Sequence, residues 1–437
     1  MPVAQVADVL ARHVPLHARL TLALSGGLDS VVLLHALLAL RGQHPVELDA
    51  VHIHHGLSPH ADDWAEFCGR LCATHGIELT IHHVQVARDD PAGIEAAARR
   101  ERQRIFAALD ADFLLTAHHQ DDQAETLLLQ LLRGSGPKGL AAMAEMQSRP
   151  GWRAVQLRPL LNVARADLLH AAQARGLAWV EDESNQDIRY RRNALRQQVM
   201  PLLAQHFPGS GRTLARAAAL QADAAELLDD LARLDAREAI AGDRLDCAEL
   251  GRLSTPRARN LLRHFIEQQG HALPNLRRLD EALHQLRDAH ADARVRVNFG
   301  QVELWRYRGG AYLVPAAPSS GAGPVFWRGD ATVWIPAAGV RVRMVPAIGQ
   351  GLRQAALAAG EVMLGVRAGG EHLRLRAGGP RRSLKNLLQE HAIPPWQRER
   401  LPLLWCDGQL AWVAGIGFEA DLRAGPGEAG VLPHVEP

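Results

Sequence analysis

Lysine and cysteine are scarce in this chain, which limits the source of its positive charge and excludes a disulfide framework. Lysine occurs only at Lys138 and Lys385, so nearly all of the positive charge is carried by arginine. Four cysteines in 437 residues are too few for a disulfide framework and predict a reducing compartment, the cytoplasm. No apolar run reaches the length of a membrane span, and no signal peptide is expected, so a membrane partner is not predicted. Because the formal net charge is only +1, nucleic-acid binding would require a local basic face.

Two motifs that would identify a site are also missing. The sequence contains no G-x-x-x-x-G-K-[ST] run, which excludes a Walker-type phosphate loop. It contains no C-x-x-C pair either, since Cys68 and Cys72 lie four residues apart on a predicted helix. A metal or redox pair is one interpretation of that spacing, but two small buried hydrophobic residues is the favoured one.

A short glycine-rich segment, residues 25–30, follows a predicted strand and precedes a predicted helix. Adjacent glycines allow a sharp turn and a close approach to a bulky anion. The helix directs unpaired N–H groups and the positive end of its dipole at the loop. An ordinary strand–turn–helix bend is the alternative, but doubly wound sheets bind nucleotides after their first strand, which favours a phosphate site. The predicted nucleotide-binding residues are Ser25, Gly26, Gly27, Leu28, Asp29 and Ser30.

Strand-like and helix-like patterns alternate over residues 18–135 and predict the fold of the N-terminal part. The alternation favours an α/β fold with a parallel, doubly wound, Rossmann-like sheet. Functional residues are then expected at the carboxyl ends of the strands. The expected strands are Leu20–Leu24, Leu48–His52, Glu78–Val84 and Asp112–Ala117, and the expected helices between them are Val31–Leu40, Asp62–His75 and Gly93–Leu109.

The rest of the chain predicts further domains, as its length also does. Residues 213–240 contain neither glycine nor proline and place leucines at heptad-like spacing, which indicates a long helix. A stretch rich in proline, glycine and serine is typical of a linker, and the short strands after it indicate a small α+β domain. The predicted divisions are 1–210 for a catalytic domain, 211–314 for a mainly helical domain, 315–324 for a linker and 325–437 for the last domain.

Polar residues collect where two of the expected strands end. His52–Gly56 closes the second strand, and half-buried histidines in a turn explain it as well as a functional role does; zinc is disfavoured because no further ligands recur at zinc-like spacing. Thr116–Thr126 leaves the fourth strand and enters a helix, whose acidic first turn would stabilise any helix by about 1 kcal/mol. Alternatively, a histidine and carboxylates here face the phosphate loop, where they hold Mg²⁺, orient an amine or take its proton.

Seven short motifs occur in order over residues 25–196. They are S-G-G-L-D-S, V-H-I-H-H-G-L-S, G-I-E-A-A-A-R, H-x-D-D-Q-A-E-T, R-G-S-G-P-x-G-L, R-P-L-L and W-x-E-D-E-S-N-x-D-x-x-Y-x-R-N-x-L-R. The first resembles the pyrophosphate loop, or PP-loop, of the ATP pyrophosphatase superfamily, and the ordered set resembles the tRNA(Ile)-lysidine synthase family. Residues 385–390 and 393–398 resemble the C-terminal domain of the family's longer form.

This resemblance implies an RNA-modifying ligase that forms a C–N bond. Members of the family use ATP to adenylate the C2 oxygen of the wobble cytidine in an isoleucine tRNA with a CAU anticodon. The ε-amine of free L-lysine then attacks C2, and AMP leaves. The resemblance therefore implies ATP and Mg²⁺ as cofactors, tRNA(Ile) and L-lysine as partners, and a homodimer.

The resemblance also assigns roles to individual residues. The loop at 25–30 would bind ATP, and Asp29 would in addition help to place Mg²⁺. Asp122 and Glu125 are candidates for gripping or deprotonating the lysine amine, which is protonated near neutral pH.

Further candidates concern the α-phosphate and the base. His119 and Arg102 would stabilise charge that develops on the α-phosphate, and the backbone at Val51–Ile53 would lie near adenine. Gln103 stands where family members often carry an aromatic residue. The choice among the arginines of residues 99–104 therefore stays open, and a solvated helix face is the alternative interpretation.

Two arginine-rich stretches are candidates for tRNA contact. Charged residues at 181–196 usually form a solvated face, but the resemblance favours RNA contact there, with Asn193 as a structural cap. In the last domain, arginines surround Trp396, and either composition bias or RNA backbone binding accounts for them. The RNA-binding candidates are Arg191, Arg196, Arg381, Arg382 and Lys385.

Two other functions compete with lysine ligation. Related tRNA enzymes that install sulfur use C-x-x-C pairs, and the spacing of Cys68 and Cys72 differs from that pattern. A non-catalytic tRNA-binding protein with a decayed site is the second alternative, and the intact loop at 25–30 argues against it.

Overall fold

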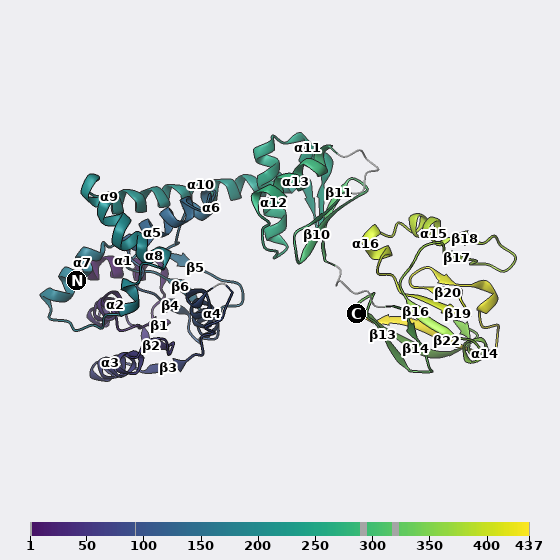
Figure 1. Cartoon of the computed structure of the whole chain (residues 1–437), viewed down its shortest axis with the longest axis horizontal. Helices are drawn as coiled ribbons and strands as arrows, with labels where there is room; N and C mark the ends of the chain where they lie inside the picture. The colour runs from purple at the N-terminus through teal and green to yellow at the C-terminus, as the bar shows by residue number, and fades with distance from the viewer. Residues whose placement is uncertain (1, 92, 289–294, 317–322, 437) are drawn as a thin grey trace. The chain divides into compact units, whose positions relative to one another are not determined.

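A computed structural model describes residues 2–91, 93–288, 295–316 and 323–436 of the chain (Figure 1). Two compact units, residues 1–228 and 229–437, are described separately below. Within the described ranges, no helix is both long enough and apolar enough to cross a membrane. The expected linker at 315–324 falls mainly on residues 317–322, which lie outside the described residues.

The first unit is built on a six-stranded sheet with the order β3-β2-β1-β4-β6-β5. Five strands are parallel, and β5 is antiparallel to β6 at one edge. The chain first adds β2 and β3 on one side of β1 and then crosses to the other side with β4. In open parallel sheets such a reversal marks the crevice where ligands bind. The strands are β1 Arg19–Ala23, β2 Glu47–His54, β3 Leu79–His83, β4 Phe113–Leu115, β5 Met146–Gln147 and β6 Val155–Leu157.

Helices cover both faces of this sheet. Phe113 and Leu115 of β4 belong to a core cluster shared with α1, α2 and α7, whereas Leu114 packs with Phe106 of α4 in a second cluster. Because successive side chains of a strand point to opposite faces, this division confirms the predicted doubly wound sheet. The helices are α1 Val3–His13, α2 Leu28–Leu40, α3 Ala61–Thr74, α4 Ile94–Ala107, α5 Gln120–Leu131, α6 Pro137–Leu140 and α7 Arg165–Ala174.

The helical pattern of α1 was not among the sequence predictions, although Val6, Val9 and Leu10 repeat at the helical period and are buried. In α3, Cys68 and Cys72 are 0% and 1% exposed and carry free thiols. Burial raises the pKa of Cys68 to about 12 and that of Cys72 to about 11. The two cysteines therefore act as small core residues, as the sequence predicted.

The segment after α7 is helical and ends in a long helix. Its elements are η1 Glu183–Gln186, α8 Arg191–Ala194, the π-helical turn η2 Leu195–Val199, α9 Met200–His206 and α10 Ser210–Ala239. The long helix predicted over 213–240 is thus confirmed. Its heptad leucines are not core residues, however, since Leu220, Leu227 and Leu234 are 61%, 69% and 55% exposed.

The second unit begins with a five-stranded sheet, β7-β8-β11-β10-β9, packed against three helices around Phe265. The sequence predicted a mainly helical domain over 211–314, so a sheet of five strands is larger than that prediction implies. Its members are β7 Ile240–Ala241, β8 Arg244–Asp246, α11 Cys247–Arg252, α12 Thr255–Gln268, α13 Leu276–Asp288, β9 Arg296–Asn298, β10 Val302–Tyr307 and β11 Gly310–Pro315.

The C-terminal part of this unit confirms the expected α+β composition. It contains sheets ordered β12-β16-β19-β20-β21 and β13-β14-β22-β15, with a separate pair β17-β18. Its helices are α14 Gln354–Ala359, α15 Leu384–Glu390, α16 Pro395–Arg398 and the 3-10 turn η3 Ala420–Leu422. The strands are β12 Val325–Phe326, β13 Thr332–Ile335, β14 Val340–Ile348, β15 Leu352–Arg353, β16 Val362–Gly365, β17 His372–Leu373, β18 Arg382–Ser383, β19 Leu403–Cys406, β20 Gln409–Val413, β21 Gly417–Phe418 and β22 Ala429–Glu436.

Candidate functional site

The glycine-rich loop forms the turn from β1 into α2, and Gly27 is the N-terminal cap of that helix. Gly26 has a φ of +82°, in the left-handed region that favours glycine. A Cβ added at Gly26 would lie 3.0 Å from Cγ2 of Val180 and 3.1 Å from Sγ of Cys68. The N–H of Val180 also donates to the carbonyl of Gly26 at 3.0 Å. The loop is therefore packed against the segment behind it. Position 26 requires glycine for two reasons: its left-handed backbone conformation and the lack of space for a Cβ.

Serine hydroxyl groups fix the inner side of the loop. Oγ of Ser30 donates to the carbonyl of Gly27 at 2.9 Å and lies 3.1 Å from Oγ of Ser25. The N–H of Gly27 is directed at Oγ of Ser25, at 3.3 Å. Since the first N–H groups of α2 lack intrahelical partners, the loop and the helix terminus together present donors that suit a phosphate group.

The second part of the site is the N-terminus of α5, which follows β4. His119 caps this helix: its Nδ1 accepts from the backbone N–H of Asp122 at 3.4 Å, and its own N–H donates to Oδ2 of Asp122 at 3.0 Å. His119 and Asp122 are 1% and 8% exposed. Because β1 and β4 are adjacent, α2 and α5 start from neighbouring strand ends, and Nε2 of His119 lies 3.6 Å from Oδ2 of Asp29.

Asp122 and Glu125, one helical turn apart on α5, both bind two arginines from the later helical segment. Arg192 places NH2 2.8 Å from Oδ1 of Asp122 and Nε 2.8 Å from Oε2 of Glu125. Arg196 places Nε 2.6 Å from Oε1 of Glu125 and NH2 2.9 Å from Oδ1 of Asp122 and 3.0 Å from Oε2 of Glu125. The Asp122 and Glu125 side chains are 11% and 1% exposed, against 29% and 33% for the arginines. These four residues are called the acid–arginine cluster below.

The pKa values of the two aspartates of the site, Asp29 and Asp122, are shifted in opposite directions. Burial raises the pKa of Asp29, and the charge of Asp122 acts in the same direction. Burial also acts to raise the pKa of Asp122, but the attraction of His119 and Arg192 outweighs it and holds that pKa below its ordinary value. Oδ1 of Asp29 is buried and has no hydrogen-bond partner among the described residues. Asp29 thus presents an oxygen that is open to a cation.

A basic side of the site is formed by α4. Arg102 is exposed there as a whole residue, but desolvation of its guanidinium group by nearby protein atoms, followed by the charges of Arg99 and Arg192, lowers its pKa. Burial, followed by the charge of Arg102, lowers the pKa of His55 to about 4. Burial also lowers the pKa of His118 to about 3, and its Nδ1 lies 3.0 Å from Oγ1 of Thr116. Both histidines are therefore neutral near pH 7, which leaves the arginines as the cations of this side.

The RNA-binding candidates lie in different settings. Arg191 is exposed on α8, whereas Arg196 belongs to the acid–arginine cluster. Arg381, Arg382 and Lys385 are exposed around β18 and α15, although Arg382 is paired with Glu390. One arginine of the wider basic stretch, Arg398, is only 8% exposed and donates from Nε to the carbonyl of Ile393, so it supports the fold of α16.

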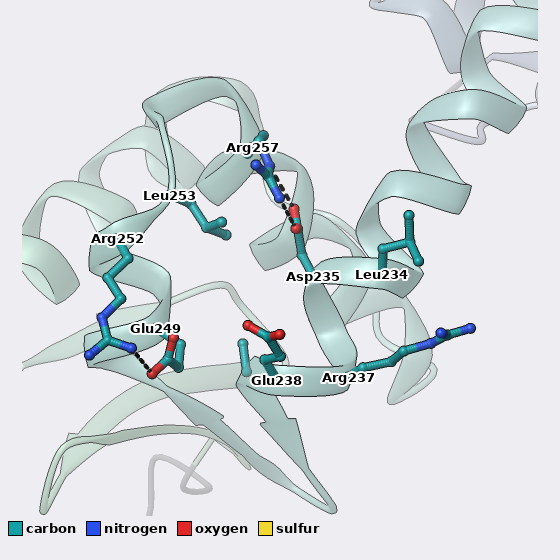
Figure 2. A pocket seen from close by; sticks show the side chains of 9 residues that line it. Leu234, Asp235, Arg237, Glu238, Glu249, Arg252, Leu253 and Arg257 are labelled. Carbon is teal, nitrogen blue, oxygen red and sulfur yellow. Dashed lines mark hydrogen bonds and ion pairs between the residues drawn. The ribbon is translucent and has the colours of Figure 1, made fainter.

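A separate hollow in the second unit lies between the C-terminal end of α10 and helices α11 and α12 (Figure 2). Two ion pairs lie at its wall, Arg257 with Asp235 and Arg252 with Glu249. None of the predicted site residues lines this hollow.

Asp29, His119, Asp122 and Glu125 were predicted as site residues from the sequence, and the structure brings them together. Arg192 was not among the predicted site residues. The available signal was weak. Arg192 and Arg196 are four residues apart, as are residues on one face of a helix, but a charge run alone does not show which carboxylates it meets across 67 to 74 residues of chain.

Family models match three parts of the chain. A PP-loop domain matches residues 3–203, a TilS substrate binding domain matches 245–312, and a TilS substrate C-terminal domain matches 362–435. The first match includes the glycine-rich loop, His119 and the acid–arginine cluster, and the third includes Arg381, Arg382 and Lys385.

Curated relatives match almost the whole chain. The tRNA(Ile)-lysidine synthase of Azoarcus sp. (strain BH72) is 46% identical over 96% of this chain and 92% of its own length. The enzyme of the same name from Aromatoleum aromaticum is 46% identical over 97% and 99%, and that of Nitrosomonas europaea is 41% identical over 96% and 92%.

Proposed function

Because this chain belongs to the tRNA(Ile)-lysidine synthase family, we propose that it ligates L-lysine to the wobble cytidine of tRNA(Ile) with a CAU anticodon. The C2 oxygen of cytidine attacks the α-phosphorus of ATP, and pyrophosphate leaves. The ε-amine of L-lysine then attacks C2, the C2–O bond breaks, AMP departs, and the amine loses a proton. Family membership favours this reaction over thiolation and over non-catalytic tRNA binding.

One observation carries the proposal: a phosphate cradle and a buried acidic pair meet at the point where the strand order reverses. The cradle comes from the end of β1, and the carboxylates come from the helix after β4. A reaction that joins an anionic nucleotide to a cationic amine needs both kinds of surface in one crevice.

Residues 25–30 bind ATP in this proposal, with the first turn of α2 directed at the leaving pyrophosphate. Asp29 fits Mg²⁺ because its Oδ1 is buried without a partner among the described residues, and carboxylate oxygen is a preferred ligand of this ion. No group of three or more His, Cys, Asp or Glu side chains within the described residues forms a metal site alone. Mg²⁺ would therefore take its other ligands from phosphate and water, and when bound it would neutralise charge on the phosphates.

The lysine amine is assigned to Asp122 and Glu125. Its pKa is near 10, so an acceptor must take a proton before the nitrogen lone pair attacks. A pair of almost fully buried carboxylates suits the ammonium form, and the lowered pKa of Asp122 favours gripping the ammonium at that residue over accepting its proton. His119, which lies between Asp29 and Asp122, and Arg102 on the basic side stabilise negative charge at the α-phosphate.

tRNA contact is assigned to exposed basic residues in both units. Arg191 serves the anticodon region, and Arg381, Arg382 and Lys385 serve the RNA backbone, where Arg382 must first release Glu390. Arg196 contacts RNA only when it leaves the acid–arginine cluster.

The homodimer and the cytoplasmic location stay predictions, and sedimentation of the full chain tests the homodimer.

The deciding experiment incubates the full chain with ATP, Mg²⁺, isotopically labelled L-lysine and a tRNA(Ile) transcript with a CAU anticodon. We expect label in the RNA and a lysidine nucleoside by mass spectrometry. A transcript whose wobble cytidine is changed to uridine is the matched control. Absence of label in the first transcript, with the chain folded and ATP bound, would refute the function.

A further inference from the structure

Both carboxylates of the acid–arginine cluster are already paired before any substrate arrives. Two carboxylates face two guanidinium groups, with five hydrogen bonds between 2.6 and 3.0 Å. The carboxylate oxygens that an ammonium group would use already accept hydrogen bonds from guanidinium groups. An ammonium group can therefore bind between Asp122 and Glu125 only if one guanidinium group moves away, and its exit also avoids the cost of an additional buried positive charge.

The two arginines are not held equally. Arg196 makes three of the hydrogen bonds and grips both oxygens of Glu125, whereas Arg192 makes one bond to each carboxylate. Both arginine side chains have a route to solvent, since Arg192 is 29% and Arg196 33% exposed, so the difference between them lies in their hydrogen bonds; the Glu125 side chain is only 1% exposed. The charge of Arg192 also acts on Arg102, whose pKa it helps to lower.

We propose that Arg192 is a resident occupant of the lysine site, displaced from Asp122 and Glu125 by the ammonium group of incoming L-lysine. The proposal rests on the function proposed above. An ammonium has three N–H donors and replaces the two hydrogen bonds that Arg192 gives up. The cluster stays neutral after the exchange, because Arg196 remains on Glu125. The α8 segment that carries Arg192 continues into the π-helical turn η2, a deviation that often occurs at functional sites.

Arg192 thus acts as a positioning residue that keeps two buried carboxylates paired until the correct cation arrives. A small cation such as Na⁺ cannot supply the directed donors of a guanidinium, so the exchange favours an amine. The cost of the exchange appears in the apparent affinity for L-lysine, because the substrate has to compete with a side chain that is always present.

The test measures KM for L-lysine with saturating ATP and tRNA(Ile) in Arg192→Gln and, as a matched control, Arg189→Gln. Arg189 lies in the same segment, is exposed and pairs with Asp187 away from the cluster. We expect Arg192→Gln to lower KM for L-lysine by about threefold or more, as removal of one charge-assisted competitor implies. Arg189→Gln should leave KM unchanged, and Arg192→Lys, which keeps the charge, should restore a KM near that of the parent chain.

An unchanged or raised KM in Arg192→Gln overturns the inference, since Arg192 would then either be irrelevant to lysine binding or assist it. If Arg192→Gln does not fold, the parent chain decides. Titration with L-lysine should shift the ¹⁵Nε signal of Arg192 and leave that of Arg189 in place. If the parent chain forms lysidine but L-lysine does not shift the Arg192 signal, the exchange is refuted and the proposed function is not. A parent chain that forms no lysidine overturns the proposed function and this inference with it.

Discussion

Replacing Gly26 by alanine tests the packing of the phosphate loop most directly. The left-handed conformation at φ +82° costs alanine about 1–2 kcal/mol. Its Cβ would in addition lie 3.0 Å from Val180 Cγ2 and 3.1 Å from Cys68 Sγ. Both neighbours belong to packed structure, so crowding adds about 1–3 kcal/mol. We therefore expect Gly26→Ala to lower the free energy of unfolding by about 2–5 kcal/mol, the sum of these two costs.

The matched control is Gly151→Ala. Gly151 has a φ of +78°, but no heavy atom lies within 4 Å of the Cβ that would be added. It therefore carries the conformational cost without the crowding, and a loss of about 1–2 kcal/mol is expected. Urea-induced unfolding measures both variants, and the lysidine assay reports whether the loop still binds ATP productively. Equal losses in the two variants, together with full turnover in Gly26→Ala, would show that the loop does not need its close contact with the segment behind it.

Three further outcomes are expected. Asp29→Ala should abolish ATP-dependent adenylation while tRNA affinity stays near that of the parent chain; near-normal turnover would remove Asp29 from the site. Arg381→Ala with Arg382→Ala should weaken tRNA binding and reduce the slope of log affinity against log salt by about 1, mostly through Arg381, because Arg382 is already paired with Glu390; an unchanged slope contradicts the RNA role. Iodoacetamide at pH 8 should leave Cys68 and Cys72 unmodified in the native chain, since burial raises the pKa of each thiol to about 12 and 11 and keeps the reactive thiolate scarce; rapid labelling would contradict their burial.

The first unit was the most predictable part of the fold. Its strands and helices follow apolar periodicities that are local in sequence, and the glycine-rich loop combines strand, turn and helix signals in one short run. A parallel sheet brings the carboxyl ends of its strands to one edge, which is why Asp29 and His119 were expected to face each other, although the strand order itself was not predicted.

Contacts between distant segments were not predictable in the same way. The sequence does not show that Cys68 and Val180 lie directly behind Gly26, or that Arg192 reaches Glu125 across 67 residues. Heptad spacing was misleading as well, because Leu220 and Leu227 have the period of a buried seam but are exposed in this chain. In the second unit, strands of two or three residues such as β7 and β8 are too short to give a period.

The imidazole ring of His119 makes one contact through each of its nitrogens, and the first contact determines what the second nitrogen can do. Because Nδ1 accepts the N–H of Asp122, the proton of the neutral ring is on Nε2, the nitrogen nearest to Asp29. Asparagine in its place would preserve the start of α5 and yet be too short to reach the loop. If His119 has the role proposed above, this one substitution should leave the circular dichroism of the chain intact and slow adenylation of the tRNA.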